Sequence, residues 1–441
     1  MSFPRYPKYQ PSGVEWLGDV PGHWEVKRLK YVTTHNDDVL DETTPPETEI
    51  VYVDISGVDG VNGITAKEPM IFSAAPSRAR RRVRHGDVIV STVRTYLRAI
   101  AKIREPEENL IVSTGFAVVR PCALDPDFLG YLLSARFFIE QVIARSTGVS
   151  YPAINASELV AIPATVPPLT EQTRIAVFLD RETAKIDGLV AEQQRLMELL
   201  KEKRQAVISH AVTRGLNPKA PIKSSGIEWL GDVPAHWEIK RLKRACHVFP
   251  SNVDKKSHDG ETPVLLCNYT DVYYNDTIIA GMDFMAATAS SDQIAKFTLR
   301  AGDTIITKDS ETADDIAISA YVPADLPGVV CGYHLSMVRP LSETAGAFVK
   351  RLFDSSYAKS CFAVLANGLT RVGLGQYELD NVELPFPPLA EQTRIAEFLD
   401  AETARFDTLT AEAQRAIDLL QERRTALISA AVTGQIDVRG V

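Results

Sequence analysis

Residues 167–180 read PPLTEQTRIAVFLD, and residues 387–400 read PPLAEQTRIAEFLD. The likeness extends to residues 213 and 433, with 31 of 47 positions identical at an offset of 220. A second string, SGVEWLGDVPGHWEVKRLK at 12–30, returns at 225–243 with 16 of 19 positions identical. The chain therefore consists of two copies of one unit, and this period is far too long for a solenoid.

The segments between the repeated strings have diverged. Only short traces remain, HGDVIVST at 85–92 beside AGDTIITK at 301–308, and VVRP at 118–121 beside MVRP at 337–340. Two frames that stay alike while their contents change indicate a tandem duplication with pseudo-twofold symmetry and two binding modules for different targets. The alternative is duplication followed by neutral drift, but drift would also have eroded the repeated strings.

The string that begins at Pro167 predicts a long helix, because residues 170–212 contain no proline and one glycine. At 1.5 Å per residue, such a helix is roughly 64 Å long. Apolar residues recur every seven positions in both copies, which indicates a coiled-coil seam with the other copy as the nearest partner. The predicted seam residues are Leu179, Ile186, Leu189, Leu196, Leu200 and Val207 in the first helix, and Leu399, Phe406, Leu409, Leu420 and Leu427 in the second. The alternative, an amphipathic helix packed on its own domain, disagrees with the length.

The interiors predict mixed α/β domains. Strands are expected from β-branched content at 48–56, 86–93 and 115–121, and at 261–268, 302–308 and 333–340. Helices are expected at 125–144, with Asp125 as N-cap, and at 346–366. The resulting organisation is a domain at 1–166, a long helix at 167–213, a polar linker at 214–225, a domain at 226–386, a long helix at 387–433 and a tail at 434–441.

Composition restricts the class of protein. The chain has 441 residues, is 24% charged and 45% hydrophobic, and carries 48 basic and 57 acidic residues for a net charge of −9. These values are typical of a globular protein and exclude a uniformly basic, histone-like one. No apolar run is long enough for a membrane span and no secretory leader is visible, so we expect a cytoplasmic protein. Five scattered cysteines without a C-x-x-C pair disfavour disulfides and a zinc site.

The common catalytic motifs are missing from the sequence. There is no P-loop, no G-x-G-x-x-G, no G-x-S-x-G, no H-E-x-x-H and no [DNS]-P-P-[YFW] of an amino-methyltransferase. Asp19, Glu25 and Lys27 suggest a nuclease only weakly, and a structural strand is the preferred interpretation. His23 and His236, each beside a tryptophan, are expected to pack at the base of each domain. The sequence therefore predicts a chain without catalytic, cofactor or metal sites.

Residues 78–104 are strongly basic, with nine Lys or Arg against one acid, Asp87. Arginine binds guanine edges and phosphates through paired hydrogen bonds, so this segment predicts DNA binding. A solvated charged face is the alternative. The predicted contacts of the first domain are Arg78, Arg80, Arg81, Arg82, Arg84, Thr92, Arg94, Tyr96, Arg98, Ser150 and Tyr151. The second domain is less basic, and its predicted contacts are Lys308, Ser310, Asn367, Thr370 and Arg371. Arg94, Tyr96 and Arg98 are the expected base readers, and residues 80–82 the expected phosphate contacts.

Over nearly its whole length the chain resembles the specificity subunit of type I restriction-modification systems. The resemblance depends on WLGDVPxHWEVKRLK, GDVIVSTVRTYLRAI, STGFAVVRP, GVSYPAINASELVAIPATVPPLTEQTRIAVFLD and the closing AVTGQIDVR. The repeated PPLxEQTRIAxFLD string is the most specific of these. The second domain departs from the pattern because it lacks a comparable basic run.

The resemblance implies two target recognition domains joined by two long helices that pack as an antiparallel coiled coil. Each domain would read one half of a split double-stranded DNA site, with the coiled coil setting the spacing. The implied partners are two modification subunits, which methylate adenine with S-adenosylmethionine, and restriction subunits, which use ATP and Mg²⁺. A coiled-coil scaffold that binds only proteins is the main alternative, and a self-sufficient methyltransferase or nuclease is a second one.

Overall fold

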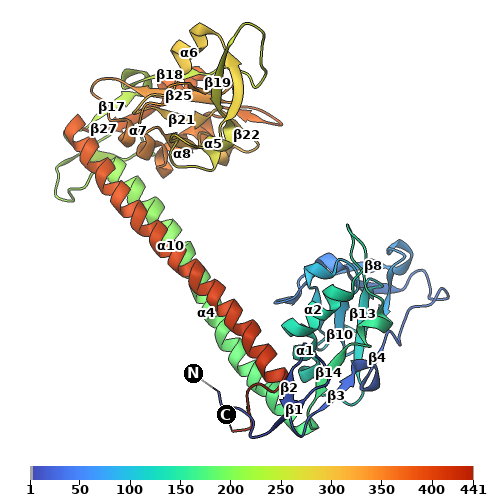
Figure 1. Cartoon of the computed structure of the whole chain (residues 1–441). Helices are drawn as coiled ribbons and strands as arrows, with labels where there is room; N and C mark the ends of the chain where they lie inside the picture. Colours follow the sequence, from blue (N-terminus) through green and yellow to red (C-terminus); the bar gives the residue numbers. More distant parts are fainter. Residues whose placement is uncertain (1–2, 441) are drawn as a thin grey trace. The chain divides into compact units, whose positions relative to one another are not determined.

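The computed structural model describes residues 3–440, which form two compact units (Figure 1). The first unit contains the described residues up to Gln193 together with those from Gln414 onward, and the second unit is Gln194–Ala413. Two long helices, α4 (Leu169–Arg214) and α10 (Leu389–Val432), each contribute to both units. The mixed α/β fold and the paired long helices expected from the sequence are confirmed. No helix within residues 3–440 has the length and apolarity needed to cross a membrane.

Two four-stranded sheets form the mixed α/β domain of the first unit. The first sheet is antiparallel with the order β11-β10-β13-β4, and the second has the order β8-β5-β12-β9 with one parallel pair, β5 and β12. The bounds of these strands are β4 Thr33–His35, β5 Glu49–Val53, β8 Glu68–Ile71, β9 Ala79–Arg82, β10 Val88–Ser91, β11 Ile100–Lys102, β12 Leu110–Ser113 and β13 Phe116–Pro121. Short pairs complete the unit: β1 (Tyr9–Pro11) with β2 (Asp19–Pro21), β3 (Glu25–Arg28) with β14 (Pro163–Val166), and β6 (Val58–Asp59) with β7 (Gly63–Ile64).

The second unit repeats this topology. Its sheets have the orders β18-β25-β21-β23 and β20-β19-β24, with β19 and β24 parallel. The bounds are β18 Cys246–Pro250, β19 Thr262–Cys267, β20 Met285–Ala289, β21 Thr304–Thr307, β23 Ser319–Tyr321, β24 Val329–Cys331 and β25 Leu335–Pro340. The short pairs are β15 (Ile222–Ser224) with β16 (Asp232–Pro234), β17 (Glu238–Arg241) with β27 (Glu383–Phe386), and β22 (Asp309–Ser310) with β26 (Val372–Gly373). Within the described second unit, no strand corresponding to β9 lies beside β24. In its place, Thr298, which follows helix α6 (Ser291–Phe297), forms a single bridge with Val330 of β24.

The short helices correct one expectation. The single helix predicted over 125–144 is two, α1 (Pro126–Ser134) and α2 (Arg136–Arg145), because the backbone of Ala135 is extended. Asp125 caps α1 as predicted, accepting from the amides of Asp127 and Phe128. The second copy is broken at the same place, where the Ser355 side chain caps α8. The remaining helices are α3 Ala156–Leu159, α5 Tyr269–Tyr273, α6 Ser291–Phe297, α7 Gly346–Phe353, α8 Ser356–Leu365 and α9 Gln376–Asn381.

The surviving traces in the interiors, GD and VRP, form one buried ion pair in each unit. Arg120 of β13 donates two hydrogen bonds of 2.8 Å to Asp87, which is 1% exposed. Arg339 of β25 binds Asp303 in the same way, at 2.8 and 2.7 Å. Since removing one member leaves a buried charge without its partner, both members are retained where the rest of the interior has changed.

The two repeated strings bind each other within each unit. In the first, Glu171 of α4 accepts hydrogen bonds from Trp24 Nε1 and from His23 Nε2 at 3.0 Å. In the second, Glu391 of α10 binds His236 Nε2 at 2.6 Å. Both histidines are exposed, so the predicted packing role is wrong in part, and each instead binds the glutamate in the first turn of its long helix.

The glutamine that follows each glutamate fixes the start of the long helix to the α/β domain of its unit. Gln172 accepts from the amide of Asp125 at 2.7 Å and donates to the carbonyl of Pro167 at 2.8 Å. Gln392 makes the matching bonds, with the Ala345 amide at 2.8 Å and the Pro387 carbonyl at 2.8 Å. The adjacent EQ residues therefore join three segments in each copy.

Of the two series of heptad positions predicted to form the seam between the long helices, one is buried and the other is not. Leu179, Ile186, Leu399, Phe406 and Leu427 are buried, and Leu200, Val207 and Leu420 are half-buried. The second predicted column is wrong, because Leu189, Leu196 and Leu409 are exposed. The buried or half-buried positions that replace it lie one residue further along: Thr183, Val190, Met197, Arg204 and Ala211 in α4, and Thr403, Thr410, Ile417, Arg424 and Ala431 in α10.

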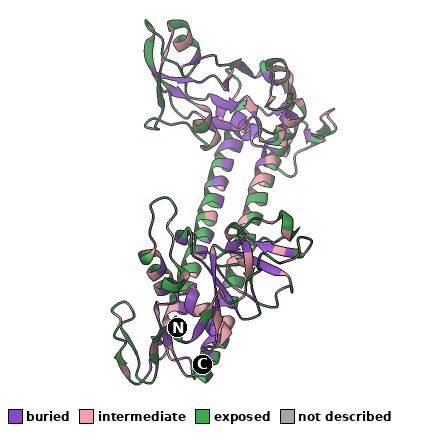
Figure 2. Cartoon of the chain, turned by 90° about the vertical axis from the view of Figure 1, so that its right-hand side faces the viewer, coloured by how far each residue is buried: buried purple, intermediate pink, exposed green. Residues whose placement is uncertain are grey.

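Each unit contains one ion pair between its two helix segments. Arg424 binds Asp187 at 3.1 Å in the first unit, and Arg204 binds Asp407 at 3.7 Å in the second. Figure 2 shows the resulting alternation of buried and exposed residues along both helices. The antiparallel pairing thus uses the same polar contact twice.

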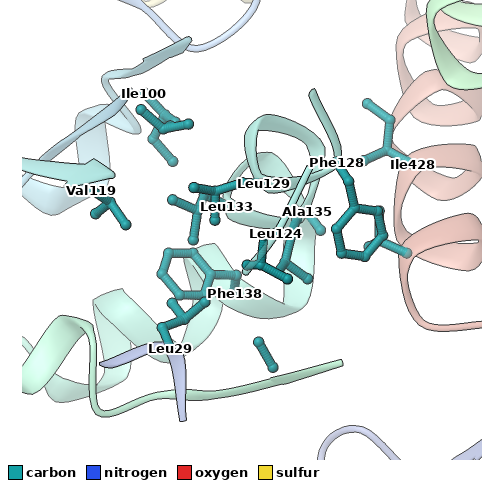
Figure 3. Packing of buried hydrophobic residues seen from close by; sticks show 14 of the residues in the cluster. Leu29, Ile100, Val119, Leu124, Phe128, Leu129, Leu133, Ala135, Phe138 and Ile428 are labelled. Carbon is teal, nitrogen blue, oxygen red and sulfur yellow. The ribbon is translucent and has the colours of Figure 1, made fainter. Parts of the chain in front are cut away.

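The hydrophobic core of the first unit includes the end of α10. Phe128, Leu129, Leu133 and Phe138 from α1 and α2 are fully buried, and Ile428 of α10 lies beside Phe128 (Figure 3). In the second unit, the end of α4 packs in the corresponding way, with Ile208, Ala211 and Val212 in the core.

The two chain ends meet in the first unit. Tyr9 donates to the carbonyl of Gly434 at 2.9 Å, and the Asp437 amide donates to the carbonyl of Pro4 at 2.8 Å. The residues from 215 to 224 occupy the equivalent place in the second unit, and the predicted linker is wrong in part because its Ile222–Ser224 forms strand β15. The N- and C-terminal segments together therefore correspond to one internal connection.

We predict that Arg120→Met lowers the free energy of unfolding of the first unit by about 3–5 kcal/mol, because Asp87 stays buried without its partner. Urea denaturation followed by tryptophan fluorescence measures the change. Arg136→Met is the matched control, since the Arg136 side chain is exposed and pairs with its helical neighbour Glu140, and it should unfold like wild type. Equal stability of Arg120→Met and the control would contradict a structural role for the pair.

Candidate nucleic-acid interface

The arginines at residues 78–84 lie on and beside β9, and most are bound by side chains of their own unit. Arg78 binds Asp54 at 2.9 Å and Tyr52 at 3.1 Å. The hydrogen bond to Tyr52, and after it the charge of Asp54, raise the pKa of the Arg78 guanidinium. Arg84 binds Asp38 at 2.7 Å, and Arg82 approaches the same carboxylate at 3.9 Å. This part of the basic segment is therefore partly neutralised.

Two further arginines of β9 are held by neutral groups. The Arg80 guanidinium lies 4.6 Å from the centre of the Phe72 ring. Arg81 is half-buried and donates to the carbonyl of Thr114 at 3.3 Å, and burial lowers the pKa of its guanidinium. Two of its nitrogens, Nε and Nη1, are buried without a partner among the described residues. A bound anion would satisfy such nitrogens.

The exposed turn Thr95–Leu97 presents the remaining predicted base readers. Arg94 and Arg98 flank it, both exposed and both in the left-handed conformation, at φ 50° and 53°. That conformation costs roughly 1–2 kcal/mol for a residue other than glycine, and strain of this kind gathers at functional sites. Neither arginine has an ion pair within residues 3–440. Tyr96, 52% exposed, lies between them.

A loop from a distant part of the sequence joins this turn. Ser146 contacts Thr95, with their hydroxyl oxygens 2.8 Å apart, and Ala153 forms a bridge with Val93. The Arg94 guanidinium lies 4.9 Å from the centre of the Tyr151 ring. Ser150 and Tyr151 are exposed on this loop. The structure therefore brings Arg94, Tyr96, Arg98, Ser150 and Tyr151 onto one surface, which we name the arginine turn surface.

Thr92 differs from the other predicted contacts. Its side chain is 8% exposed, and its hydroxyl donates to the carbonyl of Gly115 at 2.9 Å. Its backbone carbonyl accepts from the Ile154 amide at 2.9 Å. Thr92 thus connects the base of the loop to the sheet.

One predicted residue of the second unit, Arg371, binds a carboxylate that sequence reasoning missed. Asp309 accepts from Arg371 at 2.7 Å and binds His334 at 2.9 Å. Lys308 lies 4.5 Å from the centre of the Tyr333 ring. Neither Tyr333 nor His334 belongs to a local motif, because both reach this place through the pairing of β25 with β21.

Ser310, Asn367 and Thr370 complete the group. Ser310 is buried in β22, whose partner β26 contains Val372. Asn367 and Thr370 are exposed on the loop that precedes β26, at the same repeat positions as Thr147 and Ser150 of the first unit. Residues at equivalent repeat positions in the sequence therefore lie on equivalent loops of the two units.

The turn that matches Thr95–Leu97 has the opposite charge in the second unit. It contains Glu311, Asp314 and Asp315, and it ends at Ala317, whose φ of 57° corresponds to that of Arg98. Tyr273 donates to Asp315 at 2.8 Å, and this hydrogen bond raises the pKa of its phenol. Arginine donates to guanine, whereas carboxylates accept from the amino group of cytosine. One scaffold thus presents different hydrogen-bonding groups at one position.

The family described as type I restriction modification DNA specificity domain matches residues 81–198 and 234–418, more than half of the chain. A putative type I restriction enzyme MjaX specificity subunit of Methanocaldococcus jannaschii is 24% identical over 446 residues, 96% of each chain. The EcoKI specificity subunit of Escherichia coli is 19% identical over 315 residues, 70% of this chain and 65% of that relative.

Two solved structures share the fold. A chain from a study of complex assembly and conformational transition of the type I R-M system has a TM-score of 0.74 at 23% identity, covering 94% of this chain and 98% of that one. The HsdS subunit from Thermoanaerobacter tengcongensis has a TM-score of 0.55 at 23% identity, with the same coverage. With the family matching the interior of both repeats, the chain belongs to the type I restriction-modification DNA specificity family.

Proposed function

We propose that this chain is the DNA-recognition subunit of a type I restriction-modification complex and reads a bipartite site. The main evidence is that both repeats match the specificity family, while the turn at Thr95–Leu97 is flanked by arginines and the equivalent turn of the second unit contains carboxylates. Because a recognition frame with different side chains reads different bases, each unit is assigned one half of the site.

In the first unit, Arg94 and Arg98 have the reach and the free donors for base edges. Most arginines on and beside β9 already contact side chains of their own unit. We therefore assign them to phosphates, because a partly neutralised charge still adds to the affinity for DNA. In the second unit, Lys308, Thr370 and Arg371 are the corresponding contacts. This unit has fewer cations at its interface, and we expect it to bind DNA more weakly when isolated.

Catalysis is assigned to other subunits. S-adenosylmethionine is expected to bind in the modification subunits, and ATP and Mg²⁺ in the restriction subunits. This assignment is supported by the missing nucleotide-binding and methyltransferase motifs in the sequence. The role of the chain itself is to bind DNA and to hold these partners beside it.

The long helices offer two equivalent surfaces for a modification subunit. Exposed leucines lie at the same repeat positions in both units. They are Leu189 and Leu419 in the first unit, and Leu409 and Leu199 in the second. An exposed apolar patch rimmed by charges is typical of a protein interface. Two copies of one patch favour two copies of one partner.

Methylome sequencing of a host that carries the chain with its partner subunits tests the proposal. The expected result is a split adenine-methylated motif that disappears when the gene for this chain is deleted. A motif with a single half-site would contradict the assignment of one half to each unit. No dependence of methylation on this chain would favour a scaffold without DNA recognition.

We predict that Arg94→Ala relaxes readout at one base pair, reducing discrimination there by roughly tenfold to a hundredfold, because a bidentate contact is lost. Binding of the assembled complex to the target and to single-base variants measures this. Arg136→Ala removes an exposed arginine from the same unit, at helix α2, and should preserve discrimination. The assignment fails if both variants discriminate like wild type.

We predict that Leu189→Asp reduces the number of bound modification subunits from two to one, since it places a charge in one patch and leaves the other intact. Native mass spectrometry of the assembled complex counts the subunits. Ala184→Asp changes an exposed residue of the same helix outside the patch and should bind two. Full occupancy with Leu189→Asp would show that the partner docks elsewhere.

A further inference from the structure

One loop is retained in both interiors although the sequences around it have diverged. It reads STGVSYPAI at 146–154 and ANGLTRVGL at 366–374, of equal length and at an offset of 220. Its fourth residue is Val149 in one copy and Leu369 in the other. These side chains are 101% and 107% exposed, the highest values of any large apolar residue within 3–440. A residue with no buried area adds nothing to the core, so the repetition needs another explanation.

The base of each loop is fixed. Thr147 and Ala153 exchange two backbone hydrogen bonds of 2.9 Å, and Asn367 and Gly373 exchange bonds of 2.9 and 2.8 Å. Gly148 follows with a φ of 107°, where a side chain would lie 3.1 Å from the carbonyl oxygen of Tyr151. The apolar tip is therefore held out on a stiff support, and little conformational freedom remains to be lost when it binds.

The tip of each loop lies among groups suited to nucleic acid. Arg94 stacks on Tyr151 two residues beyond Val149, and the first loop contacts Thr95 of the arginine turn surface. Arg371 lies two residues beyond Leu369 and binds Asp309. Glycine and small hydroxyl residues flank both tips, so each tip side chain has no large apolar neighbour directly beside it in the sequence. A protein interface requires a larger continuous surface, whereas a single apolar side chain is enough to enter between two base pairs.

We propose that Val149 and Leu369 are DNA wedges, each inserting between neighbouring base pairs of the half-site that its unit reads. The inference rests on the proposed function and adds a deformation of the DNA to it. Because steps that unstack easily accept a wedge at lower cost, the two tips would favour flexible steps and contribute to sequence preference without a hydrogen bond.

The test uses the assembled complex and its target duplex without S-adenosylmethionine. The fluorescent base 2-aminopurine replaces single bases next to, but not at, the methylated adenines, and unstacking increases its emission. We expect an increase at one step in each half-site with wild type. Val149→Ala should abolish only the first increase and Leu369→Ala only the second, each with about tenfold weaker binding because buried methyl groups are lost.

Val177→Ala and Ile279→Ala are matched controls, since each removes methyl groups from an exposed apolar side chain outside the two loops, and both should retain the two increases. Specific binding by wild type with no increase at any step, or unchanged emission in the tip variants, would refute the wedge and leave the proposed function intact. Loss of the modification subunit from the tip variants in native mass spectrometry would show that the tips contact protein, and would also refute the wedge. A wild-type complex without specific DNA binding would refute the proposed function itself.

Discussion

The structure depends on a contact between two repeated strings that are distant in the sequence. A glutamate in the first turn of each long helix, Glu171 or Glu391, binds the histidine at the base of its recognition domain. The adjacent glutamine ties the same helix turn to a backbone amide at the start of the domain's helical layer. The direction of each long helix is thereby fixed to its domain at one point. The interior can then change freely, provided that the buried Arg–Asp pair of the sheet is retained.

Much of this frame is predictable because its signals are local or repeated. The start of the long helices follows from the paired prolines, and the N-cap of Asp125 from its position before Pro126. The second seam column could not be placed, because leucines at 189, 196 and 409 fit a heptad better by hydrophobicity than the threonines and arginines that occupy the seam. The break at Ala135 also has no local cap. It depends on packing against residues distant in the sequence.

The sequence predicts the segment that carries the proposed DNA interface, but not which of its arginines are free to bind DNA. The basic segment at 78–104 includes the exposed turn with Arg94 and Arg98, to which we assign base contacts, but charge alone does not separate these from Arg78 and Arg84, which bind Asp54 and Asp38. Arg78 meets Asp54 because strands β5 and β9 lie in one sheet, and Arg84 meets Asp38 because Val39 forms a bridge with Arg81 of β9. The role of Asp309 in the second unit was missed for the same reason. A count of charges gives the sign of a surface, and tertiary pairing decides which charges remain free.

The order of the two units along the chain has a consequence for synthesis. The core of the first unit contains Leu427, Ile428 and Val438, which are made only after the whole of the second unit. The second unit is a continuous segment that ends at Ala413. The hydrophobic face that these residues cover in the first unit therefore stays exposed on the growing chain until the second unit has been made. A chain that stops soon after Ala413 would lack part of the core of the first unit and keep all of the second.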